Sequence, residues 1–137
     1  MSLKKLEWDD IYSVGVKEID EQHKLMFKTI NELLEAINTK KSEAALGDIV
    51  KSLIDYKVYH FQTEEKYFKQ FNYSGSEEHI ARHRYFNNEL NRLTSKYSNY
   101  SLEFAFELVD FLENWLIEHL MVEDQKYKQC FKDHGLV

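Results

Sequence analysis

Potential metal-ligand side chains recur at four-residue intervals near the middle of this sequence, and this spacing constrains the fold most. His60 precedes Glu64 by four residues, and His79 precedes His83 by the same interval. On a helix, side chains four residues apart lie on one face, one turn apart. A short polar break at residues 72–76 separates the two pairs, so two antiparallel helices can bring all four side chains together. Imidazole and carboxylate together favour iron, zinc, copper or nickel over calcium or magnesium.

The composition fits one helical domain. The chain has 137 residues, no proline and only 4 glycines, so long helices are allowed almost everywhere. We expect a single domain over residues 1–137, of which residues 1–17 form an N-terminal arm. Trp8, Ile11, Val14 and Val16 are the apolar anchors of that arm. The net charge of -6 and the absence of a basic run argue against a nucleic-acid partner.

Nothing in the sequence points to a membrane or to an oxidising compartment. No apolar run reaches the ~18 residues that a membrane-spanning helix needs. No signal peptide opens the chain, and the single cysteine, Cys130, has no partner for an internal disulfide. We therefore expect no membrane span and a cytoplasmic location.

Apolar residues recur at helical spacing in four segments joined by short polar turns. The predicted helices cover residues 19–38, 43–71, 76–97 and 102–132. Ser42 and Ser101 suit the N-caps of the second and fourth helices, and Ser74 with Glu77 predicts a capping box before the third. Four helices with short connections predict an all-α, up-down-up-down antiparallel four-helix bundle.

Most of the histidines occupy core positions of these helices. A single histidine on an apolar stripe is more often a satisfied core side chain than a metal ligand. Here, however, five of the 6 histidines and two carboxylates fall on the inner stripes, and antiparallel packing brings them to one end of the bundle. This converging set comprises His23, His60, Glu64, His79, His83, His119 and Asp124.

Several motifs resemble the hemerythrin family, in particular its single-domain bacterial form. They are Trp8, VGVKEIDEQHKLMF around His23, YHFQTEE around His60, EHIARH from Glu78, and WLIEHLMVED from Trp115. The resemblance covers almost the whole chain. It implies a non-haem di-iron site in which His79, His83 and His119 bind one iron and His23 and His60 bind the other. Glu64 and Asp124 would bridge the two ions, together with an oxo or hydroxo group derived from solvent.

The resemblance also implies a function. The iron bound by two histidines would keep one coordination position open, and dioxygen would bind there reversibly. Storage, delivery or sensing of oxygen would follow, with delivery to oxygen-using proteins as the implied partnership. Five side chains within a turn of the ligands are candidates for the lining of an oxygen pocket: Met26, Phe61, Trp115, Leu116 and Leu120.

The main alternative is a di-iron enzyme, namely an oxidase or peroxidase, or a protein that handles nitric oxide. Oxidising di-iron bundles generally use more carboxylates, in Glu-x-x-His motifs. Five histidines with two carboxylates therefore favour oxygen binding, and we expect no enzymatic activity. A zinc site or a purely structural site is a more distant alternative.

Two details of the site can be predicted from local spacing. His119 and Asp124 are five residues apart and diverge by ~140° on an ideal α-helix, so we expect a local π-bulge between them. Gln22 and Glu65 each adjoin a predicted ligand in sequence and could orient a histidine N–H.

Overall fold

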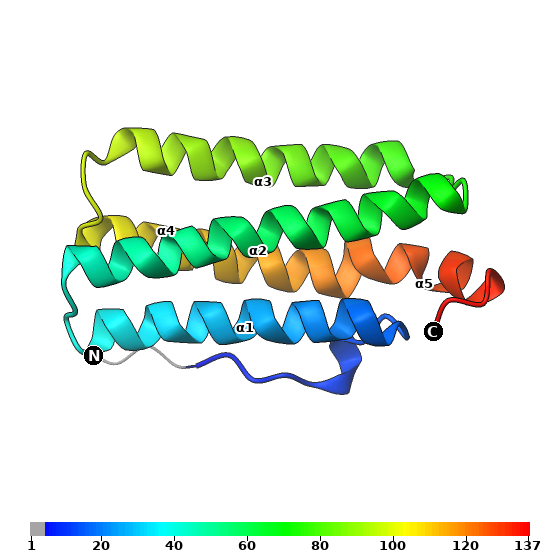
Figure 1. Cartoon of the computed structure of the whole chain (residues 1–137), viewed down its shortest axis with the longest axis horizontal. Coiled ribbons are helices and arrows are strands. Elements are labelled where there is room, and N and C mark those ends of the chain that lie inside the picture. The colour runs from blue at the N-terminus through cyan, green and yellow to red at the C-terminus, as the bar shows by residue number, and fades with distance from the viewer. Residues whose placement is uncertain (1–4) are drawn as a thin grey trace.

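The protein is an antiparallel bundle of four helical segments with an extended arm along one side (Figure 1). The fold is described from a computed structural model, over residues 5–137. Its elements in chain order are η1 (Asp10–Tyr12), α1 (Lys17–Asn38), α2 (Glu43–Gln70), α3 (Ser76–Lys96), α4 (Leu102–Glu118), η2 (His119–Glu123) and α5 (Asp124–Asp133). The last three elements follow one another without a break and form the fourth segment of the bundle.

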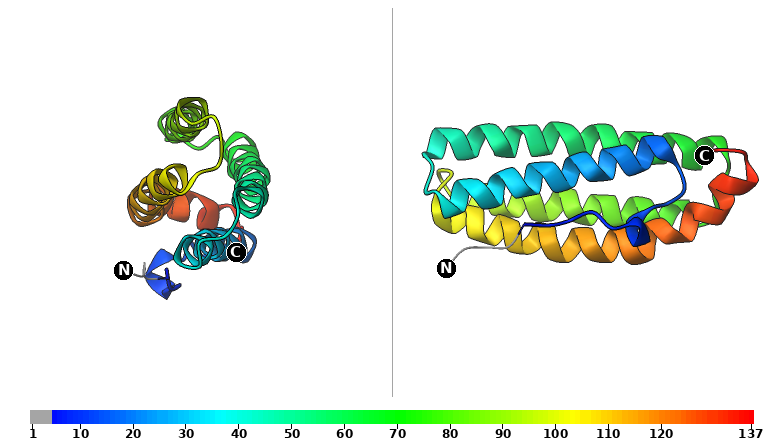
Figure 2. Two further views of the ribbon diagram at one scale, coloured as in Figure 1. Left: turned by 90° about the vertical axis from the view of Figure 1, so that its left-hand side faces the viewer. Right: turned by 90° about the horizontal axis from the view of Figure 1, so that it is seen from below.

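Each long helix packs against two neighbours. α1 lies against α2 and α4, and α3 lies against the same two helices. Seen along the bundle axis, the four segments occupy the corners of a quadrilateral (left panel of Figure 2). No strand occurs in residues 5–137, so the predicted all-α bundle is confirmed.

The helix ends follow the sequence at two of the three predicted caps. The Ser42 hydroxyl accepts a hydrogen bond from the Ala45 amide at 3.2 Å, and that of Ser101 accepts one from the Phe104 amide at 3.2 Å. The capping box predicted before α3 is wrong, because Gly75 is the N-cap and no side chain caps this helix. A turn in which the Ser76 amide donates to the Tyr73 carbonyl leaves Ser74 outside the helix.

The arm runs antiparallel to α1 along its length (Figure 1). The Leu6 amide donates a hydrogen bond to Oδ1 of Asn31 at 2.7 Å, and Nδ2 of Asn31 donates one to the Leu6 carbonyl at 2.9 Å. Trp8 packs edge-on against Phe27 with ring centroids 5.7 Å apart. The prediction that Ile11 anchors the arm is wrong, since its side chain is 59% exposed in the short turn η1. Its neighbour Tyr12 takes the inward position instead.

Asp20 fixes the junction between the arm and α1. Its Oδ1 accepts a hydrogen bond from the Val14 amide at 2.9 Å, and its Oδ2 accepts one from the Ser13 hydroxyl at 2.6 Å. These bonds hold Val14 and Val16 in the interior, where each is 1% exposed.

Loss of the Asp20 hydrogen bonds should lower the stability of the protein measurably. Asp20→Ala leaves the Val14 amide without its acceptor, which we expect to lower the free energy of unfolding by ~1–3 kcal/mol. Denaturant titration checks this value. Asp55→Ala, at an exposed position on α2, is the matched control and should change stability by less than ~0.5 kcal/mol. Equal stabilities of the two variants would contradict the role assigned to Asp20.

The apolar interior consists of two separate clusters. The larger one fills most of the bundle, from Phe104 near the start of α4 to Leu120 in η2. The smaller one closes the end of the bundle and comprises Val14, Val16, Ile19, Phe68, Tyr127 and Phe131. Between the two clusters lies a layer of histidines and carboxylates.

None of the helices in the described part of the chain combines the length and apolar character needed to cross a membrane.

Candidate metal centre

The seven predicted ligands meet in one buried layer at a single end of the bundle. None of their side chains is more than 3% exposed. They come from α1 (His23), α2 (His60 and Glu64), α3 (His79 and His83), η2 (His119) and the start of α5 (Asp124). Every histidine turns its Nε2 atom toward the two carboxylates. The structure thus brings together all the residues that the sequence singled out as ligands.

Glu64 touches histidines on two helices. Its Oε1 atom lies 3.3 Å from Nε2 of His60, 3.1 Å from Nε2 of His83 and 3.6 Å from Nε2 of His79. The second carboxylate oxygen, Oε2, is buried without a hydrogen-bond partner.

Asp124 also contacts histidines on different helices. Its Oδ2 lies 3.0 Å from Nε2 of His23, while its Oδ1 lies 3.0 Å from Nε2 of His119 and 3.2 Å from Nε2 of His79. The donors therefore fall into two overlapping sets. One contains His79, His83 and His119 with Glu64, and the other contains His23 and His60 with Glu64 and Asp124.

A π-helical turn directs the Asp124 side chain into the site. Residues His119–Glu123 form the π-helix η2, and the Asp124 amide donates to the His119 carbonyl, five residues back. The wider turn places side chains five residues apart nearly on one face. The local distortion predicted from the spacing of His119 and Asp124 is confirmed.

The arrangement of donor atoms fits metal ions. Ligands at right angles around an ion with bonds of ~2.1 Å lie ~3.0 Å apart. Nε2 of His23 and Nε2 of His60 are 3.0 Å apart, like several of the histidine–carboxylate pairs. Moreover, Nε2 of His79, Nε2 of His119 and both oxygens of Asp124 are buried without a hydrogen-bond partner. Such atoms are costly to bury, and a bound cation removes the cost.

The charges of the layer also call for a cation. Burial would raise the pKa of the Glu64 carboxyl, but His60 and other histidines hold it well below its usual range. Burial and Glu64 oppose ionisation of Asp124, yet His119 keeps its pKa low as well. Burial would lower the pKa of His79, but Asp124 and Glu64 raise it to about 10. Two ionised carboxylates are therefore buried together, and protons or metal ions must balance them.

Residues 14–131 match the family model described as "Hemerythrin HHE cation binding domain". The chain belongs to the hemerythrin family. It is 29% identical over 135 residues to a bacteriohemerythrin of Stenotrophomonas maltophilia, covering 94% of this chain and 83% of that protein. It is 32% identical over 121 residues to a hemerythrin-like protein of Naegleria gruberi, covering 88% of this chain and 89% of that protein.

A solved structure agrees with these matches. The crystal structure of a wild-type hemerythrin has a TM-score of 0.81 to this chain at 25% identity, covering 93% of this chain and 98% of that one. With the donor sets described above, family membership makes the chain a non-haem iron protein of an oxygen-binding family.

Two histidines of this hemerythrin chain have a partner on their outer nitrogen, as the sequence suggested. Nδ1 of His60 lies 2.7 Å from Oε1 of Gln22, and Nδ1 of His83 lies 2.8 Å from Oε2 of Glu65. Gln22 is in turn held by the Thr63 hydroxyl, which accepts a hydrogen bond from Nε2 of Gln22 at 3.2 Å. Contacts of this kind fix the orientation and the tautomer of a ligand histidine.

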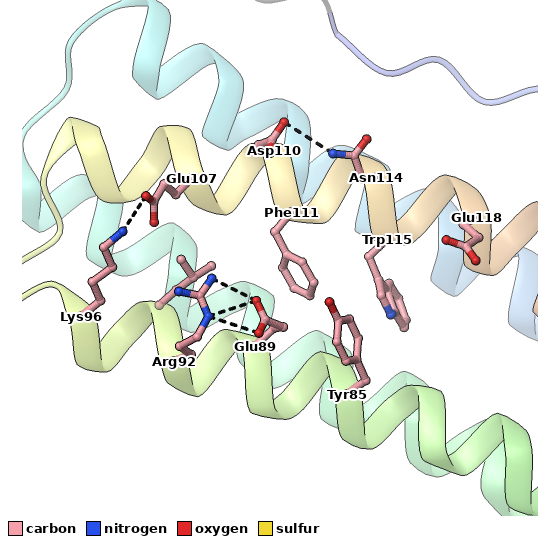
Figure 3. Close-up of a pocket in the computed structure, with 11 residues that line it drawn as sticks. Tyr85, Glu89, Arg92, Lys96, Glu107, Asp110, Phe111, Asn114, Trp115 and Glu118 are labelled. Atoms are coloured by element: carbon pink, nitrogen blue, oxygen red, sulfur yellow. Dashed lines mark hydrogen bonds and ion pairs between the residues drawn. The ribbon is translucent and has the colours of Figure 1, made fainter.

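Aromatic rings cover two histidines on the side of the larger cluster. Phe61 stacks on His83 with ring centroids 3.8 Å apart, and Trp115 stacks on His119 at 4.2 Å. Trp115 also lines a surface groove between α3 and α4, together with Tyr85 and Phe111 (Figure 3). The indole therefore lies between this groove and a predicted ligand.

The remaining pocket candidates, Met26, Leu116 and Leu120, are all at most 1% exposed and belong to the larger apolar cluster. Their burial fits a dry pocket, and it equally fits plain core packing. Their contact with an oxygen ligand therefore stays a prediction.

Tyr127 was not singled out from the sequence, but it lies beside the predicted ligands. This residue is 0% exposed, its ring lies 5.6 Å from that of His79, and its buried hydroxyl has the Glu64 carboxylate as a polar neighbour. Burial, helped by the charges of Asp124 and Glu64, raises its pKa well above the usual value. The signal that could have found it is its position three residues after Asp124, which places it one turn further on the same helix face.

Proposed function

We propose that the chain holds two iron ions and binds dioxygen reversibly at one of them, as a carrier, store or sensor of oxygen without enzymatic activity. His79, His83 and His119 would hold one ion, and His23 and His60 the other. Glu64 and Asp124 would bridge the ions with their two oxygens each, beside an oxo or hydroxo group from solvent. The family match and the two donor sets support this assignment.

The unequal number of protein donors carries the proposal. The three-histidine set with both carboxylates offers five donors, and the two-histidine set with both carboxylates offers four. With a shared solvent bridge, the first ion would have six ligands and the second would have five. The second set would therefore leave one position for an external ligand, as at other metal sites that bind one. When bound there, two ferrous ions would supply the electrons that reversible binding of dioxygen requires.

The protein around the ions supports reversible binding more than turnover. The ligands are at most 3% exposed, so bulk water is kept from the centre. The Tyr127 hydroxyl, whose pKa burial raises well above its usual value, adds no negative charge to the centre. A set of five histidines and two carboxylates also has fewer carboxylates than oxidising di-iron bundles use.

A cycle of gas exchange tests the function. The iron-loaded protein, reduced and kept under nitrogen, should contain two irons per chain by elemental analysis. Admission of air should produce a new absorption spectrum, and a return to nitrogen should restore the first one. Nitric oxide should compete for the same position.

Other outcomes would contradict the proposed function. A spectrum that changes in air but does not return would remove the carrier assignment. Continuous consumption of oxygen with an added reductant or organic substrate would identify an oxidase instead. One metal per chain, or zinc after growth with sufficient iron, would remove the di-iron site.

A further inference from the structure

The two histidine sets differ in the charge of the partner on their outer nitrogens. On the three-histidine side, Nδ1 of His83 faces the carboxylate of Glu65 at 2.8 Å. On the two-histidine side, Nδ1 of His60 faces the neutral carboxamide of Gln22 at 2.7 Å. The two contacts are nearly equal in length, and each joins neighbouring helices. They differ in charge and in exposure, since the Glu65 side chain is 37% exposed and that of Gln22 is buried.

The neutral contact is firmly placed. The Gln22 side chain is 4% exposed, and its Nε2 donates to the Thr63 hydroxyl, which itself donates to the Tyr59 carbonyl at 3.0 Å. This chain of donors fixes the oxygen of Gln22 toward His60. Nδ1 of the other histidine in this set, His23, is buried without a hydrogen-bond partner. Neither histidine of the two-histidine set therefore has an anionic partner on Nδ1.

Charge on this partner changes the histidine as a ligand. A carboxylate that accepts the Nδ1–H bond pulls the proton away from the ring, which makes the opposite nitrogen a stronger donor to a metal. An amide oxygen accepts the same bond without the negative charge, and charge-assisted bonds are roughly twice as strong as neutral ones. A stronger nitrogen donor stabilises a ferric ion more than a ferrous ion, because the ferric ion carries the higher charge.

We propose that Glu65 and Gln22 are positioning residues that make the two iron sites unequal. Glu65 strengthens the three-histidine site and lowers its reduction potential, whereas Gln22 orients His60 without this effect. The two-histidine site, which holds the open position, is then the weaker site and the first to lose its ion. The inference rests on the proposed two-iron function and adds which of the two ions is held more tightly.

Exchanging the two partners tests the ranking. The variants are Glu65→Gln, Gln22→Glu and the double exchange, and Glu78→Gln is the matched control. Glu78 lies one residue before His79, and its carboxylate faces Lys126 at 3.7 Å, so the control removes a charge nearby without touching a histidine partner. The reduced, oxygen-free proteins are mixed with 2,2′-bipyridine, and the release of each iron is followed by absorbance. The midpoint potential of the iron centre is measured separately.

The wild type should release its ions in two phases. Glu65→Gln should speed the slow phase by at least ~10-fold, as expected for loss of an outer partner of a ligand. A tenfold change in the redox equilibrium corresponds to ~59 mV for one electron, so the potential should rise by about that amount. Gln22→Glu should slow the fast phase, and the double exchange should narrow or reverse the difference between the release rates of the two ions. Glu78→Gln should match the wild type.

Several results would overturn the inference. It is wrong if Glu65→Gln leaves both the release rates and the potential within twofold of the wild type, or if Glu78→Gln produces the same shifts. Where Glu65→Gln fails to fold, Gln22→Glu decides alone, because an unchanged fast phase contradicts the role of partner charge. Release of a single ion would instead contradict the two-iron function. Two phases in a wild type that lacks a reversible oxygenated spectrum would contradict the carrier function and leave the ranking standing.

Discussion

Asp124→Ala should reduce the iron content from two ions per chain to less than one. Asp124, like Glu64, reaches histidines of both sets, with oxygens 3.0 Å from Nε2 of His23 and 3.0 Å from Nε2 of His119. Its removal takes one ligand from each ion at once. Loss of an outer partner alone costs ~10–100-fold in metal affinity, and loss of a shared direct ligand should cost more. Elemental analysis after desalting measures the effect, and the oxygenated spectrum should vanish with the iron.

Asp110→Ala is the matched control for this substitution. Asp110 is exposed on α4 and accepts a hydrogen bond from the Asn114 side chain at 3.4 Å, away from the centre. This variant should keep two irons and the spectrum of the wild type. If Asp124→Ala also keeps two irons, Asp124 is not a bridging ligand and the assignment of both donor sets falls.

Leu116→Ala should shorten the lifetime of the oxygenated protein by at least about tenfold, which corresponds to ~1.4 kcal/mol in the barrier. Leu116 is 1% exposed and lies one turn before His119, in the larger apolar cluster. If it forms part of a dry wall around the open position, truncation admits water and favours oxidation of the iron. The cavity itself should also lower the free energy of unfolding by ~2–5 kcal/mol. The decay of the oxygenated spectrum is measured at a temperature where both proteins stay folded.

Leu108→Ala separates these two effects. Leu108 is 0% exposed in the same helix and the same cluster, two turns further from His119. It should lose a similar amount of stability while the oxygenated spectrum decays at the wild-type rate. Equal acceleration in both variants would mean that Leu116 only fills the core.

Periodicity was enough to predict the bundle, because long stripes of apolar residues average over local errors. The convergence of the ligands was predictable for the same reason, since antiparallel packing places His23, early in α1, near His60, late in α2. The five-residue spacing of His119 and Asp124 even predicted a π-helical turn, because a regular helix cannot turn both side chains inward.

Short-range features were harder to predict. Ile11 and the start of α3 depend on turns of three or four residues, in which one backbone hydrogen bond decides which side chain faces inward. The surroundings of the Tyr127 hydroxyl could not be read from periodicity, because a tyrosine on an apolar stripe can place its hydroxyl against a polar partner or in water. Only the three-dimensional structure shows that this hydroxyl is enclosed beside the Glu64 carboxylate, away from solvent.

The division of the apolar interior into two clusters has a consequence for folding. The smaller cluster joins the junction of the arm and α1, through Val14, to the last helix, through Phe131, across the layer of predicted ligands from the main core. Without metal this layer holds two buried carboxylates and several unpaired polar atoms, so it connects the two clusters poorly. Bound iron would join the two clusters, and its loss should let the arm–α1 junction and α5 open together as one local unit before the bundle unfolds. Hydrogen exchange at the ends of the chain would therefore report whether the centre is loaded.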